Sequence, residues 1–555
     1  MGRVDRQQAA VTYGIWKRIA QSVDRLGDPV LLLGFLATTL IIALFVLYPV
    51  IRVVTYPSSQ DFVGLLDHPR WMRAIVNSLT MAGLSTVTAC LLGFVFALAL
   101  TRPDIPGQGL FRAISILPLF SPPFTVAFSY LLLFGRLGLI THTLLNLRVD
   151  ILGWRGLWLS QTVSFFPIAT IAISRVLENI PANMEFAARN LGANEVSVFR
   201  TITMPLARPG FAGAMLLVAL YVLADFGNPL IIGGDFPILA TEAWYQIEGW
   251  ADLRAAAMLA SLLLVPALVL FLMERRWVSR RQYTTIVGRG VRGERRATPR
   301  ALKVFLLVIC SVASLFVISI YAGVIIGSLT NVWGADWHLT LRHWTAALRR
   351  WPHVKNSLVV SGGAAALAAL LGLLTAYFTR GKALVASAAL DFGAMLPAAI
   401  PGVFLGIGYL LAFNGPPLAF SSTIWILILA LCFWNLPFAY KTAASGFQQI
   451  DHMLEEAAEN LGAPWFRVFM DVYFPLLRRT VGAAFITTFV NSVTNLSITM
   501  FLVTAHFLVA TVSILALVSD NRLGVGAALT TLLLSVTFGV VALGFRWIGR
   551  SVLVD

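Results

Sequence analysis

The sequence predicts an all-α membrane protein of about twelve transmembrane helices, arranged as two homologous halves of six helices each. Three observations support this fold class: the composition is apolar, the apolar residues form long segments, and the second half repeats motifs of the first. The 555 residues are 58% hydrophobic and only 12% charged, whereas soluble chains are about 25% charged. A soluble fold of this size has too little interior to bury so much apolar surface, so lipid must surround most of the chain.

Twelve segments are long and apolar enough to cross a bilayer. A transmembrane helix needs about 20 apolar residues, because each residue advances about 1.5 Å across roughly 30 Å of hydrocarbon. The third and ninth segments contain a proline pair or Pro-Gly, which predicts that these two helices are bent or broken. The expected spans are residues 29–51, 77–100, 110–134, 157–177, 210–232, 255–273, 304–326, 356–378, 386–412, 424–443, 481–504 and 527–546.

The net charge of +15 lies mainly in short segments between the apolar ones. This pattern is typical of cytoplasmic loops and suits contact with anionic lipid headgroups rather than with nucleic acid. The three cysteines, Cys90, Cys310 and Cys432, lie singly inside apolar segments. They lack the spacing of a metal or redox site, so we expect no metal centre.

The distribution of Lys and Arg also predicts the orientation. Residues 1–28 form a polar, basic tail, which we expect to be cytoplasmic and to precede an uncleaved first helix. An even number of spans then places the C-terminus in the cytoplasm as well. Residues 274–303 contain ten Lys or Arg against two Glu, so we interpret them as a basic cytoplasmic linker between half one, residues 29–273, and half two, residues 304–555. Residues 327–355 depart from the rule, because they fall outside and yet carry four basic residues.

The two halves repeat in sequence. Asn77-Ser78-Leu79 recurs as Asn356-Ser357-Leu358, and Leu117-Pro118 recurs as Leu396-Pro397, both 279 positions later. A repeat of this length indicates two copies of one structural unit. Because both copies begin and end on the same side, they are expected to be parallel repeats related by an axis along the membrane normal.

The most specific repeat lies in two loops, residues 178–209 and 447–478. Each loop contains a short run of strong helix formers, a glycine suited to a left-handed C-terminal cap, and a hydrophobic-proline pair further on. The shared residues are Glu185, Ala187, Ala188, Leu191, Gly192 and Pro205 in the first loop, and Glu455, Ala457, Ala458, Leu461, Gly462 and Pro475 in the second.

These two segments resemble the EAA loop of ABC importer permeases, although Phe186 and Glu456 stand where that motif has its first alanine. The resemblance implies a type-I importer permease fold in the bacterial inner membrane. In that family the loop forms a coupling helix that sits in a cleft of the ATP-binding subunit. The resemblance therefore implies two copies of a separate ATP-binding subunit and an extracytoplasmic substrate-binding protein as partners.

The chain contains no GxxxxGK[ST] phosphate loop, so we predict that it is not an enzyme and binds no cofactor. ATP and magnesium would be used by the partner subunit.

Polar groups and helix breaks inside the spans are candidates for a substrate passage. They are Asp225, Asn228, Asn495, Pro118 and Pro397. Asp225 and Asn495 occupy equivalent positions in the two halves, where they either line a shared passage or hold a helix-breaking turn.

Residues 225–242 resemble fused, two-half permeases of the ferric-iron type. The resemblance implies import of ferric iron, with thiamine, phosphonate or another small solute as alternative cargo. A twelve-span secondary transporter and a non-transporting scaffold are alternatives from other classes.

Overall fold

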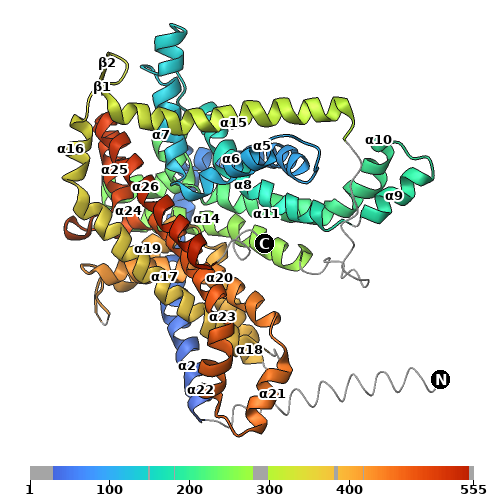
Figure 1. The fold of residues 1–555 in the computed structure, drawn as a ribbon. Helices are drawn as coiled ribbons and strands as arrows, with labels where there is room; N and C mark the ends of the chain where they lie inside the picture. The colour runs from blue at the N-terminus through green and yellow to red at the C-terminus, as the bar shows by residue number, and fades with distance from the viewer. Residues whose placement is uncertain are drawn as a thin grey trace.

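The computed structural model describes residues 29–147, 150–180, 182–278, 298–380, 385–416 and 418–548. The tail 1–28 and most of the linker 274–303 lie outside the described residues. Within the described residues the chain is almost entirely helical. The one sheet among the described residues is a two-stranded antiparallel hairpin of β1 (Thr330–Val332) and β2 (Asp336–Leu339). The all-α fold class is therefore confirmed (Figure 1).

Half one begins with a first span that contains a π-helical turn, η1. Its elements are α2 (Pro29–Ile42), η1 (Ala43–Leu47), α3 (Tyr48–Thr55), α4 (Ser59–Gly64), η2 (Leu65–Asp67), α5 (Pro69–Leu100), α6 (Gln108–Ile116), η3 (Leu117–Phe120), α7 (Phe124–Phe134), η4 (Leu139–Leu144), α8 (Trp154–Glu178), α9 (Ala182–Asn190), α10 (Glu195–Val198), η5 (Phe199–Thr203), α11 (Met204–Leu223), α12 (Gly227–Ile232), α13 (Leu239–Trp250), α14 (Leu253–Met273) and η6 (Glu274–Val278).

Half two follows the same order, with the hairpin added after its first span. Its elements are α15 (Arg300–Leu329), β1, β2, α16 (Arg342–Leu348), α17 (Trp351–Thr379), α18 (Val385–Met395), η7 (Leu396–Ala399), α19 (Gly402–Phe413), α20 (Ile424–Gln448), α21 (His452–Asn460), α22 (Trp465–Arg467), η8 (Val468–Tyr473), α23 (Phe474–Val493), α24 (Thr499–Leu502), η9 (Ala505–Phe507), α25 (Ala510–Ser519) and α26 (Leu523–Ile548).

Ten of the described helices are long and apolar enough to cross a membrane, or eleven if the pair 387–399 and 402–413, bent by 112°, counts as one span. The remaining expected span, 481–504, is the eleventh in chain order and corresponds to α23, whose first turns carry Arg478 and Arg479. The breaks predicted in the third and ninth spans are present, because the turns η3 and η7 interrupt both at their prolines. The fifth and eleventh spans are also broken, since α11 ends at Leu223 and α23 at Val493.

Each half has a core of three helices, α5, α8 and α11 in half one and α17, α20 and α23 in half two. Two equivalent glycines allow helix backbones to approach closely in these cores. A Cβ on Gly93 would lie 2.6 Å from the Cβ of Ala169, and one on Gly372 would lie 2.7 Å from the carbonyl carbon of Ala439. The backbones of α5 and α8, and of α17 and α20, therefore touch directly.

The first span of each half packs against the other half. The hydroxyl of Tyr409 in α19 donates to the carbonyl of Phe45 in η1, at 2.9 Å. In the reverse direction, Ser129 of α7 donates to the carbonyl of Ile320 in α15, at 2.7 Å. This exchange holds the two halves together as one body.

In Figure 1, α9 and α10 lie at the right of the view and α21 and α22 lie at its bottom, and both pairs lie away from β1, β2 and α16 at the upper left. We refer to α9, α10, α21 and α22 together as the loop end, and to β1, β2 and α16 as the hairpin end. Helix α17 connects them, because it starts directly after α16 and is followed by Arg380, which pairs with Glu455 in α21.

Candidate coupling loops and substrate passage

The first candidate coupling loop is a short helix with a glycine-hinged end. Helix α9 ends in a left-handed turn at Gly192, whose φ is +90°. The amide of Gly192 donates to the carbonyl of Arg189 at 2.9 Å, and the amide of Ala193 to that of Ala188 at 3.0 Å. These two bonds form a Schellman cap, which places the expected glycine at the position that needs a positive φ.

The second loop repeats this geometry. Helix α21 turns at Gly462, whose φ is +80°, and the amide of Ala463 donates to the carbonyl of Ala458 at 3.1 Å. In both loops the residue before the glycine, Leu191 or Leu461, is 89% exposed. Each loop exposes this leucine at its tip, and further apolar side chains of the loops are exposed as well, namely Met184, Val196, Met453 and Phe466. Exposed apolar residues that gather in this way favour a surface that packs against a partner.

The repeated glutamates of the two loops, Glu185 and Glu455, face their own bundle. Thr203 donates to Glu185 at 3.0 Å, and Arg189 lies 3.5 Å from Glu185 and 2.8 Å from Glu195. The hydrogen bond to Glu195 raises the pKa of Arg189. These bonds fix α9 to the start of the next span.

Glu455 is tied down by a different cation. It is 3% exposed and lies 3.8 Å from Arg380, whose guanidinium stacks over the ring of Tyr473 at 4.7 Å. The acidic group of each loop thus pairs with a basic residue of this chain. Burial, with Glu455 beside it, raises the pKa of Tyr473.

Both coupling loops join the next span through a π-helical turn. Turn η5 precedes Pro205 and turn η8 precedes Pro475, each proline lying in the first turn of α11 or α23. A proline ring displaces the carbonyl four residues earlier, and a widened π turn accommodates this without ending the helix. Each repeated proline therefore marks a bend where its loop joins the next span.

Asp225 and Asn495 lie in the breaks of the fifth and eleventh spans. The amide of Asn228 donates to Asp225 at 3.3 Å, and the amide of Ile498 donates to Asn495 at 2.9 Å. Both side chains thus accept a backbone amide three residues on, at the turn that leads into α12 or α24. This geometry supports the helix-breaking turn that the sequence offered as one of two roles.

Around Asp225, half one has a buried polar network that half two lacks. Gln161 and the side chain of Asn228 donate to Asp225 at 3.0 and 2.9 Å, and Ser160 donates to Asn228 at 2.7 Å. The equivalent positions in half two, 270 residues on, are Leu431, Ile498 and Ala430. The two breaks therefore share a backbone geometry but not a polar lining.

Pro118 and Pro397 lie in the turns that break the third and ninth spans. The next helix of each span rests on the other break: a Cβ on Gly227 would lie 3.0 Å from the Cβ of Phe124, and one on Gly402 would lie 2.0 Å from Ser497. The breaks of the third and fifth spans thus lie beside each other in half one, and those of the ninth and eleventh spans do so in half two.

These two pairs of breaks meet between the halves at residues that the sequence did not suggest. The ring of Phe226 lies 5.9 Å from that of Phe501 and 6.3 Å from that of Trp244, and the rings of Trp244 and Phe501 are 5.2 Å apart. Leu496, the equivalent of Phe226, lies beside Gly227. All except Trp244 are buried. We refer to Phe226, Trp244, Leu496 and Phe501 together as the closure. The signal that could have found it is the bulky apolar residue directly after Asp225 and Asn495.

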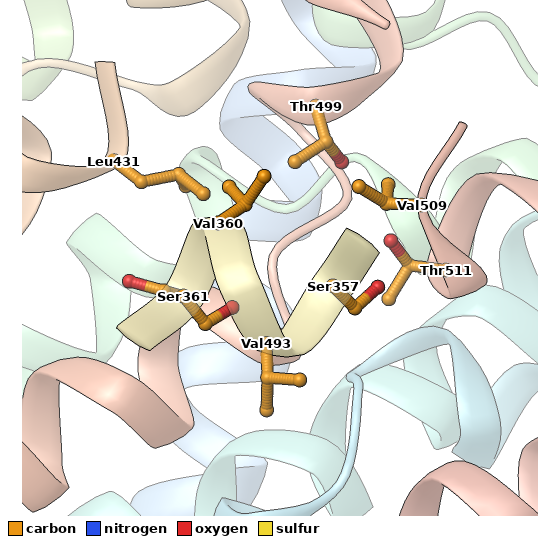
Figure 2. Close-up of a pocket in the computed structure, with 9 residues that line it drawn as sticks. Ser357, Val360, Ser361, Leu431, Val493, Thr499, Val509 and Thr511 are labelled. Carbon is orange, nitrogen blue, oxygen red and sulfur yellow. The ribbon is translucent and has the colours of Figure 1, made fainter. Parts of the chain in front are cut away.

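Figure 2 shows the side chains around a small gap within half two, among them the hydroxyl residues Ser357, Ser361 and Thr511, and the gap has no space for a water molecule. All its lining residues belong to half two, so it is not a passage between the halves. Among the described residues no group of three His, Cys, Asp or Glu is placed to hold a metal ion.

Comparison with known proteins identifies the family. Residues 89–283 and 368–551 both match the family described as binding-protein-dependent transport system inner membrane component. The chain is 33% identical to the ferric transport system permease protein FbpB of Actinobacillus pleuropneumoniae over 542 residues, 94% of this chain and 79% of the relative. It is 31% identical to the putative ferric transport system permease protein FbpB 1 of Haemophilus influenzae, over 86% of this chain and 79% of the relative.

A relative named for a different cargo matches a single half. The molybdenum transport system permease protein ModB of Escherichia coli is 34% identical over 175 residues, 31% of this chain and 76% of the relative. The two family matches correspond to the two halves seen in the fold. The chain therefore belongs to the inner membrane components of binding-protein-dependent transport systems, as a permease whose two domains are fused in one polypeptide.

Proposed function

We propose that this chain is the permease of an ATP-driven importer for ferric iron. The observation that carries the proposal is the pair of glycine-hinged loops, each with an exposed leucine at its tip and a glutamate bonded into its own bundle. A knob fixed to its bundle and apolar at its tip is suited to receive force from a partner. The ferric cargo is supported by relatives of that printed name, which match most of the chain.

In the proposed assembly, one ATP-binding subunit docks on each coupling loop, so two copies serve one permease. The loop end is then cytoplasmic, together with both termini, and the binding protein docks at the hairpin end. ATP-driven closure of the two subunits moves the loops, and the halves rock about their common axis.

The closure defines what this motion must achieve. Phe226 meets Phe501, and Leu496 lies beside Gly227, across the two halves, so a solute crosses only when the halves separate there. The described residues around the closure offer carboxylate, amide and hydroxyl oxygens on the side of half one. Such oxygens are hard ligands, which suit a hard cation in transit.

Reconstitution tests the proposal. The chain is purified with an ATP-binding subunit encoded beside it, placed in liposomes, and supplied with the iron-loaded binding protein. We expect uptake of radioactive iron that requires ATP, stops with an ATP-binding subunit lacking its phosphate-loop lysine, and stops with unloaded binding protein. Uptake that proceeds without ATP would instead support a secondary transporter, and uptake of phosphonate, thiamine or molybdate but not iron would contradict the cargo.

The orientation has its own test. Leu191→Cys and Leu461→Cys place reactive thiols at exposed tips, against a background of three buried cysteines. A membrane-impermeant maleimide should label both variants in inside-out vesicles and neither in right-side-out vesicles. Labelling from the outside would contradict the cytoplasmic placement.

A further inference from the structure

The repeated Asn-Ser pair ties one helix of each core to the start of a later helix in the same half, namely α5 to α13 and α17 to α25. In half one, Asn77 of α5 donates to the carbonyl of Pro237 at 3.0 Å, and the amide of Leu239 donates to Ser78 at 2.9 Å. In half two, Asn356 of α17 donates to the carbonyl of Leu508 at 3.1 Å, and the amide of Ala510 donates to Ser357 at 2.8 Å. The same two bonds thus hold the start of α13 and of α25.

A third tie acts at equivalent positions one turn further along α13 and α25. In half one, Nε of Arg70 donates to both carboxylate oxygens of buried Glu242, at 3.0 and 3.1 Å, and Nη2 of Arg70 lies 3.0 Å from Oε1. In half two the residue equivalent to Glu242 is Ser513, which lies 3.0 Å from Nδ1 of His353. Three side-chain interactions therefore join α5 to the start of α13, and three join α17 to the start of α25.

The opposite ends of α5 and α17 contact the coupling loops. The ring of Phe94 in α5 lies 6.2 Å from that of Phe199 in turn η5. The ring of Tyr377 in α17 lies 5.4 Å from that of Phe469 in turn η8, and Arg380 directly after α17 pairs with Glu455. Each helix thus touches a coupling loop at one end and is tied to α13 or α25 at the other.

These two helices are built to transmit force. Helix α5 has 32 residues and α17 has 29, which correspond to lengths of about 48 and 44 Å. Neither has a proline beyond its first turn, whereas α8, α11, α14 and α20 each contain an internal proline. Because sharp kinks arise mainly at prolines, α5 and α17 lack a kink site that these four helices have.

The tied helices lead directly to the closure. Trp244 belongs to α13, and its ring packs on Phe226 and Phe501. In half two, Thr511 of α25 donates to the carbonyl of Asn495 at the helix break, at 3.2 Å. A displacement of α13 or α25 therefore moves groups that hold the closure shut.

From these contacts we propose that α5 and α17 are connecting rods between the coupling loops and the closure, with Asn77, Ser78, Asn356 and Ser357 as their positioning residues. The inference rests on the proposed function, because it assigns the path by which loop motion reaches the passage. The same path carries the docking of a loaded binding protein back to the ATP-binding subunits.

The test compares Ser78→Ala/Ser357→Ala with Ser78→Thr/Ser357→Thr in the full complex with its ATP-binding subunits and binding protein. Alanine removes the oxygen that accepts the amide of Leu239 or Ala510, whereas threonine keeps it. We expect the alanine variant to lose roughly tenfold in the stimulation of ATP hydrolysis by loaded binding protein, because buried hydrogen bonds are broken in both halves. Basal hydrolysis should stay near that of the wild type, and threonine should restore stimulation.

Two controls separate this role from plain stability. Thr80→Ala removes a hydroxyl of the same helix that bonds only to the carbonyl of Val76, four residues earlier, and it should leave stimulation unchanged. Asn77→Leu/Asn356→Leu breaks the companion bonds and should behave like the alanine pair. The proposed role of α5 and α17 would be wrong if the serine-to-alanine variant lost basal and stimulated hydrolysis in parallel. It would also be wrong if both the serine-to-alanine and the asparagine-to-leucine variants kept wild-type stimulation. Absence of stimulation in the wild type would instead contradict the proposed function.

Discussion

At the scale of single residues, Gly192 and Gly462 are set by backbone conformation and not by space. A Cβ at either position would meet no atom within 4 Å, yet φ is +90° and +80°. Side-chain-bearing residues strain in this region by about 1–2 kcal/mol, and asparagine tolerates it best. The glycines therefore fix the direction in which each loop leaves its helix.

We predict that Gly192→Val/Gly462→Val uncouples ATP hydrolysis from uptake, because the strained turn moves Leu191 and Leu461 from their docked positions. Gly192→Asn/Gly462→Asn should retain most uptake. The measurement is iron taken up per ATP hydrolysed in the same liposomes. Unchanged coupling in the valine variant would show that the loops do not carry the force.

The polar network of half one allows a swap test. Asp225→Asn alone places an amide nitrogen against donors from Gln161 and Asn228, which should cost about 1–3 kcal/mol. Combining it with Ser160→Ala, Gln161→Leu and Asn228→Ile gives the residues found at these positions in half two, and we expect the unfolding temperature and uptake to recover. If this fourfold variant regains stability but not uptake, Asp225 lines the passage instead of only holding the turn at the start of α12.

At the scale of elements, the sequence located the helices better than their internal breaks. The prolines of residues 110–134 and 386–412 predicted interruptions there, and the structure has them. The breaks after Leu223 and Val493 lay inside segments that composition alone showed as continuous spans. They arise because Asp225 and Asn495 accept amides three residues on, and hydropathy does not register this local competition with the helix.

The contact of α5 with α8, and of α17 with α20, yields a prediction about packing. Gly93→Ala and Gly372→Ala insert a methyl group against backbone atoms less than 3 Å away, so each should lower stability by roughly 1–3 kcal/mol. Gly83→Ala is the matched control, since nothing lies within 4 Å of its Cβ, and it should raise helix stability by about 0.5–1 kcal/mol. Thermal unfolding of the purified variants measures all three, and equal effects would contradict the close approach.

At the scale of the whole molecule, the exchange of first spans makes the halves interdependent. Phe45 of half one stacks on Phe433 of half two at 5.0 Å, and Phe316 of half two stacks on Phe134 of half one at 5.9 Å. Each half alone would expose these surfaces. The peptide link between the halves is thus one of several connections.

We therefore predict that a chain divided within residues 279–297 assembles when its two parts are produced together. A tag on half one should retrieve half two from detergent, and the pair should support uptake. Either part produced alone should be degraded. Failure of the parts to associate would show that the covalent linker, and not the exchanged spans, holds the halves together.

The sequence by itself determined the membrane fold class, the two-half repeat and the loops with their hinge glycines, because these depend on composition and on spacing along the chain. It also marked Asn77-Ser78 and Asn356-Ser357 as a repeat, without indicating their partners. Only the tertiary structure decided that Asn77-Ser78 bonds to Pro237 and Leu239, and that Asn356-Ser357 bonds to Leu508 and Ala510. It also decided that Glu455 pairs with Arg380, and that Phe226 meets residues of the other half. These partners are separated by 75 to 275 residues, so no local pattern encodes them, and only the packing of the two halves brings them into contact.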